Sequence, residues 1–172
     1  SGVEHFNETH FERVFVSDDA VLGDVGAGWQ QITSELALER SGPERFLSTF
    51  VTLEQAVRHL APDEGGHRAI IIGQMLARIR ALRAMSLGVA ALMEKGTSPD
   101  VEAALVKELG TRLEQDIIEK LRQFWPVSLK PSNGNQFDDL MVNSLLRQPS
   151  FTLRGGTNEI LKGIVARSVG LR

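Results

Sequence analysis

Apolar residues recur at steps of three and four along three long segments of this 172-residue chain, and this spacing restricts its possible folds more than any other feature. Residues so spaced share one face of an α-helix, so each segment is expected to form an amphipathic helix. Because Pro43 follows Gly42 within the first segment, 29–60, we expect a kink or a fresh first turn there. The stripe of that segment consists of Trp29, Ile32, Leu36, Glu39, Pro43, Phe46, Phe50, Leu53, Val57 and Leu60.

The second segment follows a turn expected at 61–66, and the third opens at Ser98-Pro99 with a capping serine and a first-turn proline. Two shorter helices are expected near 137–145 and from Asn158 onward. Amphipathic helices joined by short turns predict a mainly α protein, an up-and-down helical bundle. The second stripe is Ile72, Met75, Ile79, Leu82, Ser86, Val89 and Met93, and the third is Leu105, Leu109, Leu113, Ile117 and Leu121.

The first 26 residues follow a different pattern from the rest. From Phe6 to Val16, phenylalanine and valine alternate imperfectly with polar residues, which is typical of one or two β-strands. Glycines then make a flexible approach to the first long helix. We therefore divide the chain into 1–26, the end of a β domain with its linker, and 27–172, a helical bundle domain.

The composition argues against several classes of function. With a formal net charge of -3 and both signs interspersed, neither nucleic acid nor an anionic membrane surface is expected as a partner. The chain has no cysteine and its four histidines lack the spacing of metal ligands, so no metal site is expected. No apolar run approaches the roughly 18 residues of a membrane span, and no signal peptide is evident. These features predict a soluble, cytoplasmic protein.

Glu39 is the one acidic residue in the first apolar stripe. A carboxylate on a buried face costs several kcal/mol unless it is paired or neutralised, and Arg40 and Arg45 are close enough in sequence to pair with it. Two interpretations follow. Glu39 is either half of a structural ion pair, which is the commoner situation, or a catalytic base that faces a pocket.

A second candidate site is the short loop Arg154-Gly155-Gly156-Thr157-Asn158-Glu159. Two glycines let the backbone approach a ligand closely, and the helix that opens behind Thr157 directs free N–H groups and its dipole at whatever lies there. A Gly-Gly-Thr turn is more often simply a helix cap, so by itself the loop is a weak indication of binding.

Taken together, these stretches resemble one family, the acyl-CoA dehydrogenases. The run 153–160, followed by 164–167, is similar to the signature that closes these enzymes, and Leu38-Glu39-Arg40 before Gly42-Pro43 is similar to the start of their C-terminal helical domain. The segment 6–29 resembles the end of their middle β domain. The resemblance covers nearly the whole chain, as the second half of a longer enzyme.

Most members of that family carry a catalytic glutamate immediately before the Gly-Thr pair, where this chain has Gly155. In the isovaleryl- and long-chain-type members the glutamate lies instead on the first helix, before an arginine, and the loop residue is small. Glu39, Arg40 and Gly155 match that second arrangement. The resemblance therefore implies that Glu39 removes the α-proton of an acyl-CoA while the β-hydrogen leaves as hydride to FAD, with Arg40 orienting or balancing the base.

The resemblance also implies which residues approach the flavin and which partners are required. The cofactor-contacting residues would be Gly155, Gly156, Thr157 and Glu159. In the family, subunits complete one another's flavin sites across the helical domain, which implies a homo- or hetero-oligomer. By itself the chain is expected to fold into a mostly helical domain without activity.

Two motifs of the family are replaced in this chain. The family's Arg-x-x-Phe-Gly stretch, which contacts the adenosine half of a neighbour's flavin, gives way to 60–66, and a Gly-Gly-rich adenosine contact gives way to 126–135. His67 and Arg68 are candidate substitutes. These departures leave a second interpretation open: a non-catalytic partner subunit or assembly module of a heteromeric acyl-CoA dehydrogenase.

Overall fold

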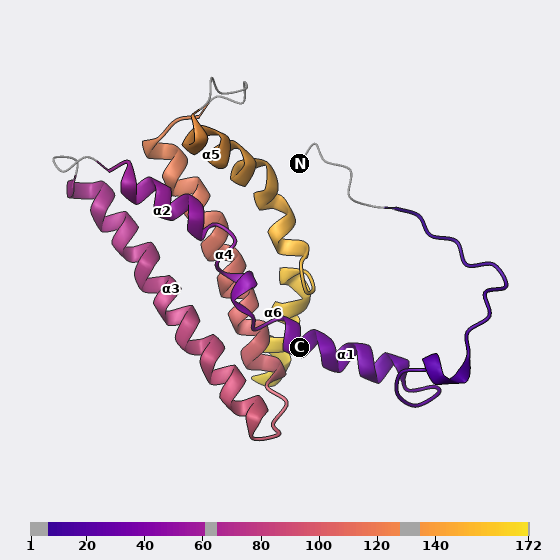
Figure 1. Cartoon of the computed structure of the whole chain (residues 1–172). Helices are drawn as coiled ribbons and strands as arrows, with labels where there is room; N and C mark the ends of the chain where they lie inside the picture. The colour runs from indigo at the N-terminus through magenta and orange to yellow at the C-terminus, as the bar shows by residue number, and fades with distance from the viewer. Residues whose placement is uncertain (1–6, 61–64, 128–134, 172) are drawn as a thin grey trace.

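The structure, a computed structural model, describes residues 7–60, 65–127 and 135–171 (Figure 1). All regular elements in these ranges are helical, so the predicted mainly α fold is confirmed. The α-helices are α1 (Gly28–Glu39), α2 (Phe50–Arg58), α3 (Gly65–Glu94), α4 (Asp100–Phe124), α5 (Gln136–Arg147) and α6 (Asn158–Ser168). Three 3-10 helices are η1 (Asp18–Ala20), η2 (Pro43–Arg45) and η4 (Gln148–Leu153).

Helix α4 is the centre of the bundle. The long helix α3 runs antiparallel along one side of it, while α5, η4 and α6 cover another side (Figure 1). Helices α1 and α2 and the turn η2 also pack on α4. The chain thus folds around a single helix that is in contact with the segments before and after it in sequence.

The residues of α4 explain how it can be surrounded. Its fully buried apolar side chains include Ala104, Val106, Leu113 and Ile118, which do not all fall on one narrow face. At Gly110 a Cβ atom would lie 2.5 Å from the carbonyl oxygen of Arg45, so only glycine lets η2 approach this closely. The predicted third stripe is confirmed at Leu113, Ile117 and Leu121, but it was wrong at Leu109, which is 41% exposed, and it missed the other side of the buried arc.

The predicted stripe of α3 agrees with the structure. Its members Ile72, Met75, Ile79, Leu82 and Val89 are all buried against α4. A single helical face was therefore enough to identify the contact between these two helices.

The first predicted helix is divided into three pieces. α1 ends at Glu39, η2 begins at Pro43, and α2 begins at Phe50. The Gly42-Pro43 pair breaks the helix because proline cannot donate to the backbone ladder. Trp29 is 81% exposed, so the start of the predicted stripe lies outside the core.

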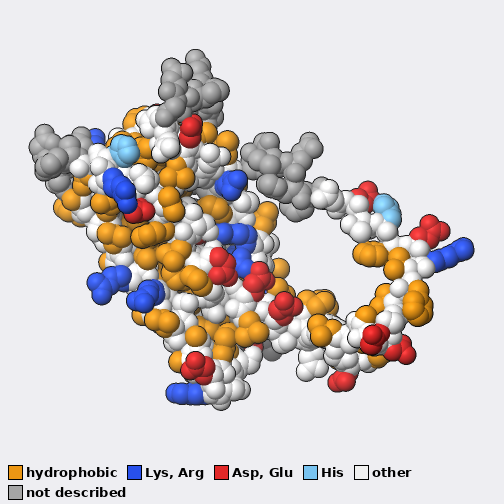
Figure 2. Space-filling view, in the orientation of Figure 1, with side chains coloured by type: hydrophobic (Ala, Val, Ile, Leu, Met, Phe, Trp, Pro, Cys, Tyr) orange, Lys and Arg blue, Asp and Glu red, His pale blue; other side chains and the backbone are white. Residues whose placement is uncertain are grey.

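The predicted N-terminal strands are not present in the part of this segment that the structure describes. Residues 7–27 form neither strand nor helix apart from η1, and they stand away from the helical body as an arm that continues into the start of α1 (Figure 1 and Figure 2). A strand requires a paired neighbour, and an alternating sequence without one does not form a sheet. Phe6 and most of the predicted turn at 61–66 lie outside the described residues, as do 128–134 within the predicted loop 126–135.

Among the helices described, none combines the length and the apolar character required to cross a membrane.

Candidate functional site

The Gly-Gly-Thr loop joins η4 to α6. Gly155 and Gly156 have φ values of 63° and 99°, a left-handed backbone that a side chain would strain. Thr157 is the N-cap of α6, and its hydroxyl oxygen accepts from the N–H of Ile160 at 3.5 Å. Hydrogen bonds from its own backbone N–H and from the Thr157 hydroxyl lower the pKa of the exposed Glu159. The loop is therefore a real helix cap, as the simpler interpretation required.

Arg40 connects this loop to the end of α1. Its Nε atom donates to the carbonyl oxygen of Gly155 at 2.9 Å. The expected pairing of Arg40 with Glu39 is absent, and no carboxylate of the described residues forms an ion pair with Arg40. Arg40 thus supports the loop rather than the adjacent carboxylate.

Glu39 pairs with Arg45 instead. Nη2 of Arg45 binds Oε1 of Glu39, and Nε of Arg45 donates to the Glu39 carbonyl oxygen at 3.1 Å. The Arg45 side chain is 6% exposed, whereas that of Glu39 is 50% exposed. The expectation that Glu39 lies on a buried face was wrong, because α1 ends at this residue and projects from the bundle. A catalytic role for Glu39 remains a prediction.

Arg45 also brings Glu39 close to the Gly-Gly-Thr loop. A Cβ atom at Gly155 would lie 3.5 Å from both Cζ and Nη2 of Arg45. The same guanidinium therefore touches the carboxylate of Glu39 and the space beside Gly155. The two positions that matched the family arrangement in sequence are neighbours across Arg45.

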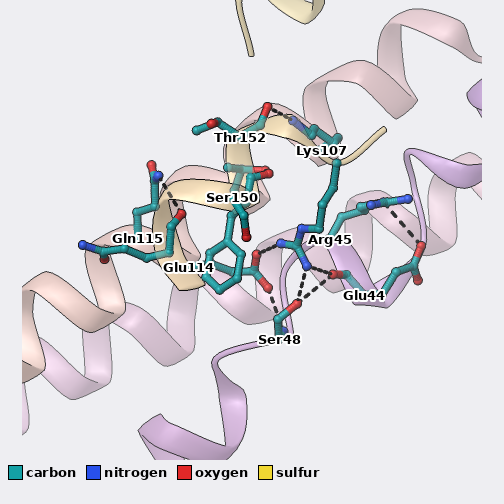
Figure 3. Close-up of polar contacts among 12 residues, drawn as sticks. Glu44, Arg45, Ser48, Lys107, Glu114, Gln115, Ser150 and Thr152 are labelled. Atoms are coloured by element: carbon teal, nitrogen blue, oxygen red, sulfur yellow. Dashed lines mark hydrogen bonds and ion pairs between the residues drawn. The ribbon is translucent and has the colours of Figure 1, made fainter. Parts of the chain in front are cut away.

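Lys107, which the sequence pattern did not single out, is fully buried in α4. Its ammonium donates to the carbonyl oxygen of Thr152 at 3.2 Å (Figure 3). It also donates to the carbonyl oxygen of Gly156 at 2.7 Å and to Oδ1 of Asn158 at 2.8 Å. Burial, then the positive charges of Arg154, Arg45 and Arg40, lowers the pKa of Lys107 to about 8, while Glu108 acts in the opposite direction.

Glu114, which the pattern also did not single out, is fully buried on the same helix. Its carboxylate accepts from the backbone N–H of Ser48 at 2.7 Å and pairs with the guanidinium of Arg154 (Figure 3). Arg154 also donates to Oγ of Ser48 at 2.7 Å and lies 4.4 Å from the Phe151 ring centroid. The residue before the two glycines is thereby attached both to α4 and to the segment leading into α2.

A sequence signal for these two charges exists. Positions 103, 107, 111, 114 and 118 follow helical spacing, and all are buried in α4. On this additional stripe of α4, Lys107 and Glu114 are charged residues among small or apolar ones. Such residues are rarely buried without a specific partner.

Four cations surround the loop: Arg40, Arg45, Lys107 and Arg154. The ion-paired carboxylates beside them are Glu39, Glu44 and Glu114, and the first two share Arg45. Glu159 adds a fourth carboxylate in the first turn of α6, so the charges beside the loop are close to balance, and it is the N–H donors of the arginines that fit the acceptor-rich edge of a flavin ring. Loop glycines without Cβ atoms and the N-terminus of α6 fit close approach by the same group. The described residues thus fit contact with a flavin.

The candidate substitutes for the family's adenosine contact lie elsewhere. His67 meets the ring of Phe124 edge to face at 6.0 Å, and the guanidinium carbon of Arg68 lies 5.7 Å and 5.4 Å from the ring centroids of Phe124 and Trp125. This aromatic cluster joins the start of α3 to the end of α4. Within the described ranges, no group of three or more His, Asp or Glu side chains is placed to hold a metal ion.

In sequence, the chain is similar to proteins of one family. The family described as "Acyl-CoA dehydrogenase, C-terminal domain" matches residues 26–170. The chain is 26% identical, over 177 aligned positions, to Acyl-CoA dehydrogenase FadE34 of Mycobacterium tuberculosis. This alignment covers 99% of the chain and 24% of the relative, so the chain spans about a quarter of that protein's length.

The Glu114–Arg154 pair is expected to contribute strongly to stability. Glu114→Gln should lower the free energy of unfolding by roughly 2 to 4 kcal/mol, because it leaves Arg154 without its buried counter-ion. Asp116→Asn, two residues further along α4, removes the 2.7 Å pair with Arg78 whose side chains are about half exposed, and should cost less than about 1 kcal/mol. Urea unfolding of both variants measures the difference. Equal losses of unfolding free energy in the two variants would show that burial of the Glu114–Arg154 pair does not increase its contribution to stability.

The low pKa of Lys107 predicts an unusual pH dependence of stability. Between about 8 and the ordinary value of 10.5, the unfolded chain binds a proton at this position and the folded chain does not. The free energy of unfolding should therefore rise with pH in this window, by up to about 1.4 kcal/mol per pH unit. Lys107→Met removes that contribution. Urea unfolding of both proteins between pH 7 and pH 10 should give curves that diverge above pH 8, and parallel curves would contradict the assignment.

Proposed function

The chain belongs to the acyl-CoA dehydrogenase family, as a form of its C-terminal helical domain, and on this basis we propose that it forms part of a flavoprotein that oxidises an acyl-CoA thioester between its α- and β-carbons. The observation that carries the proposal is the placement of Glu39 and Gly155 on either side of Arg45. A carboxylate base beside a small loop residue leaves room for an acyl chain between them.

In this proposal Glu39 is the base. The α C–H bond breaks, its proton goes to the Glu39 carboxylate, and its electron pair forms the new double bond as the β-hydrogen departs as hydride. A bound FAD supplies the hydride acceptor. Because Arg45 binds Oε1 of Glu39, Oε2 is the oxygen that receives the proton. The exposed half of the Glu39 side chain is the part that substrate and the remainder of the longer protein would cover.

The loop residues would hold the cofactor. Gly155 and Gly156 permit close approach of the backbone, and Thr157 fixes the first turn of α6, where Glu159 lies. Arg40 acts here by holding the Gly155 carbonyl through Nε, which fixes the backbone of the loop at that residue. The donors that remain on its guanidinium are available to an anionic or acceptor-rich group.

A second candidate function is a non-catalytic partner subunit of a heteromeric enzyme. One observation favours it: the Glu39 carboxylate is committed to Arg45, whose guanidinium is almost completely buried. An ion pair of this kind is a sufficient structural reason for a glutamate at the end of α1. The replacement of both adenosine-contact motifs points in the same direction.

Substitution of Glu39 separates the two functions. In the longer protein that contains this chain, Glu39→Gln should lower kcat for acyl-CoA oxidation at least about 100-fold, because the amide keeps the shape and loses the base. Glu44→Gln is the matched control, since Glu44 also contacts Arg45, at 3.5 Å, without being the proposed base. Flavin reduction by a panel of acyl-CoA thioesters, together with urea unfolding, gives activity and stability for each variant.

The two functions predict different results. A large loss of turnover at unchanged flavin content and stability supports Glu39 as base. Turnover that survives in Glu39→Gln, with a stability loss like that of a broken ion pair, would assign Glu39 a structural role. Flavin binding without turnover in the unmodified protein would favour the partner subunit.

We also propose that the helical domain associates with another subunit. α3 packs mainly on α4 in the part of the chain that is described, and it exposes Ile70 (60%), Leu87 (56%) and Leu76 (39%). Leu76 and Leu87 are eleven residues, or about three turns, apart and therefore share one face of α3, and an exposed apolar face of this kind supports an interaction surface. The partner is either a second copy of the chain or a homologous subunit.

The expected state in solution is a dimer or tetramer. Light scattering of the longer protein, expressed alone and with any homologue encoded beside it, should give a mass of at least two chains. Leu87→Gln should shift the mass toward the monomer, while Leu153→Gln, at a residue 66% exposed on η4, should not. A monomer under both conditions would contradict this proposal.

A further inference from the structure

Lys107 lies in an environment that lysine usually avoids. It is fully buried in α4, where lysine is rarely found without a specific partner. Three arginines add positive charge around it, which further disfavours its ammonium. Packing alone does not require an ammonium here, because methionine would fill a similar volume.

The contacts of Lys107 all lie in one short segment of the chain. Thr152 is near the end of η4, Gly156 is in the loop, and Asn158 is the first residue of α6. An ammonium has three N–H donors, and the three contacts at 2.7, 2.8 and 3.2 Å account for all of them. A single side chain of α4 therefore ties together both ends of the Gly-Gly-Thr loop.

No carboxylate in the described part of the chain forms an ion pair with Lys107. The nearby Glu108 instead pairs with Arg112 at 2.6 Å. The acceptors of Lys107 are two backbone carbonyls and one side-chain amide, so its position depends on the path of the loop backbone. These contacts are those expected of an ammonium that fixes the conformation of a loop.

We propose that Lys107 is a positioning residue for the candidate site: its ammonium fixes the carbonyl of Gly156 and the first residue of α6, and so presents the loop N–H groups to the bound cofactor. The effect on the loop stands by itself. The effect on cofactor and turnover rests on the proposed function.

The first experiment measures the loop directly in the 172-residue chain. Lys107→Met should increase amide hydrogen exchange at residues 154–160 at least about 10-fold, since local opening no longer breaks three hydrogen bonds. Lys120→Met, at an exposed lysine of the same helix, is the control and should leave these rates unchanged. Rates in Lys107→Met equal to those of the unmodified chain would overturn the proposal.

A rescue experiment separates the ammonium from packing. The chain has no cysteine, so Lys107→Cys provides a unique thiol that can be alkylated while the chain is unfolded. Reaction with 2-bromoethylamine creates a lysine-like ammonium, and after refolding the exchange rates at 154–160 should return to within about 3-fold of the original. Alkylation with iodoacetamide gives a neutral side chain and should not restore them. Equal protection by both reagents would show that volume, not charge, holds the loop. This comparison also decides the question if Lys107→Met does not fold.

The second experiment uses FAD itself with the longer protein. Lys107→Met should raise the Kd of FAD at least about 10-fold and lower kcat while the KM for acyl-CoA changes less than about 3-fold, and Lys120→Met should change none of them. Faster loop exchange with unchanged FAD affinity would overturn the link to the cofactor. If the unmodified protein binds FAD but does not oxidise acyl-CoA, the proposed function fails while the loop result still tests Lys107.

Discussion

The arrangement of this protein depends on two buried charges of the central helix α4. Lys107 and Glu114 are fully buried, and both face the loop that precedes α6. Lys107 binds the loop backbone directly, and Glu114 holds it through Arg154. Removing ions from water is costly, so both remain only because their partners are placed accurately. The same contacts that offset this cost also fix the candidate site.

The sequence predicted the buried residues correctly where a helix packs one face against one neighbouring helix. The stripe of α3, from Ile72 to Val89, is such a case, and the sequence also indicated the cap at Thr157. The N-terminal strands failed because alternation requires a paired neighbour that residues 7–27 do not have among the described segments. Helix α4 was only partly predicted, since it is buried over a wide arc and a search for one apolar stripe passes over Lys107 and Glu114.

The sequence identified residues of the candidate site that lie close together, but it did not identify all of the hydrogen bonds and ion pairs between them. Glu39, Arg40 and Gly155 do lie near one another, although far apart in sequence. One connection differs from expectation, since Arg40 binds the Gly155 carbonyl, whereas the pair of Glu39 with Arg45 was one of the two that the sequence allowed. Sequence spacing cannot choose between two arginines so close to one carboxylate, because the choice depends on where α1 ends. That end is set by the Gly42-Pro43 turn, which directs Arg45 inward.

We propose that the Glu39 carboxylate meets the α-carbon of an acyl thioester beside Gly155. A crystal structure of the longer protein with FAD and an acyl-CoA bound tests it most directly. We predict that Oε2 of Glu39 lies roughly 3 to 3.5 Å from the α-carbon, with Arg45 still on Oε1 and the acyl chain passing Gly155. An α-carbon that lies against a different carboxylate, with Glu39 in contact only with Arg45, would contradict it.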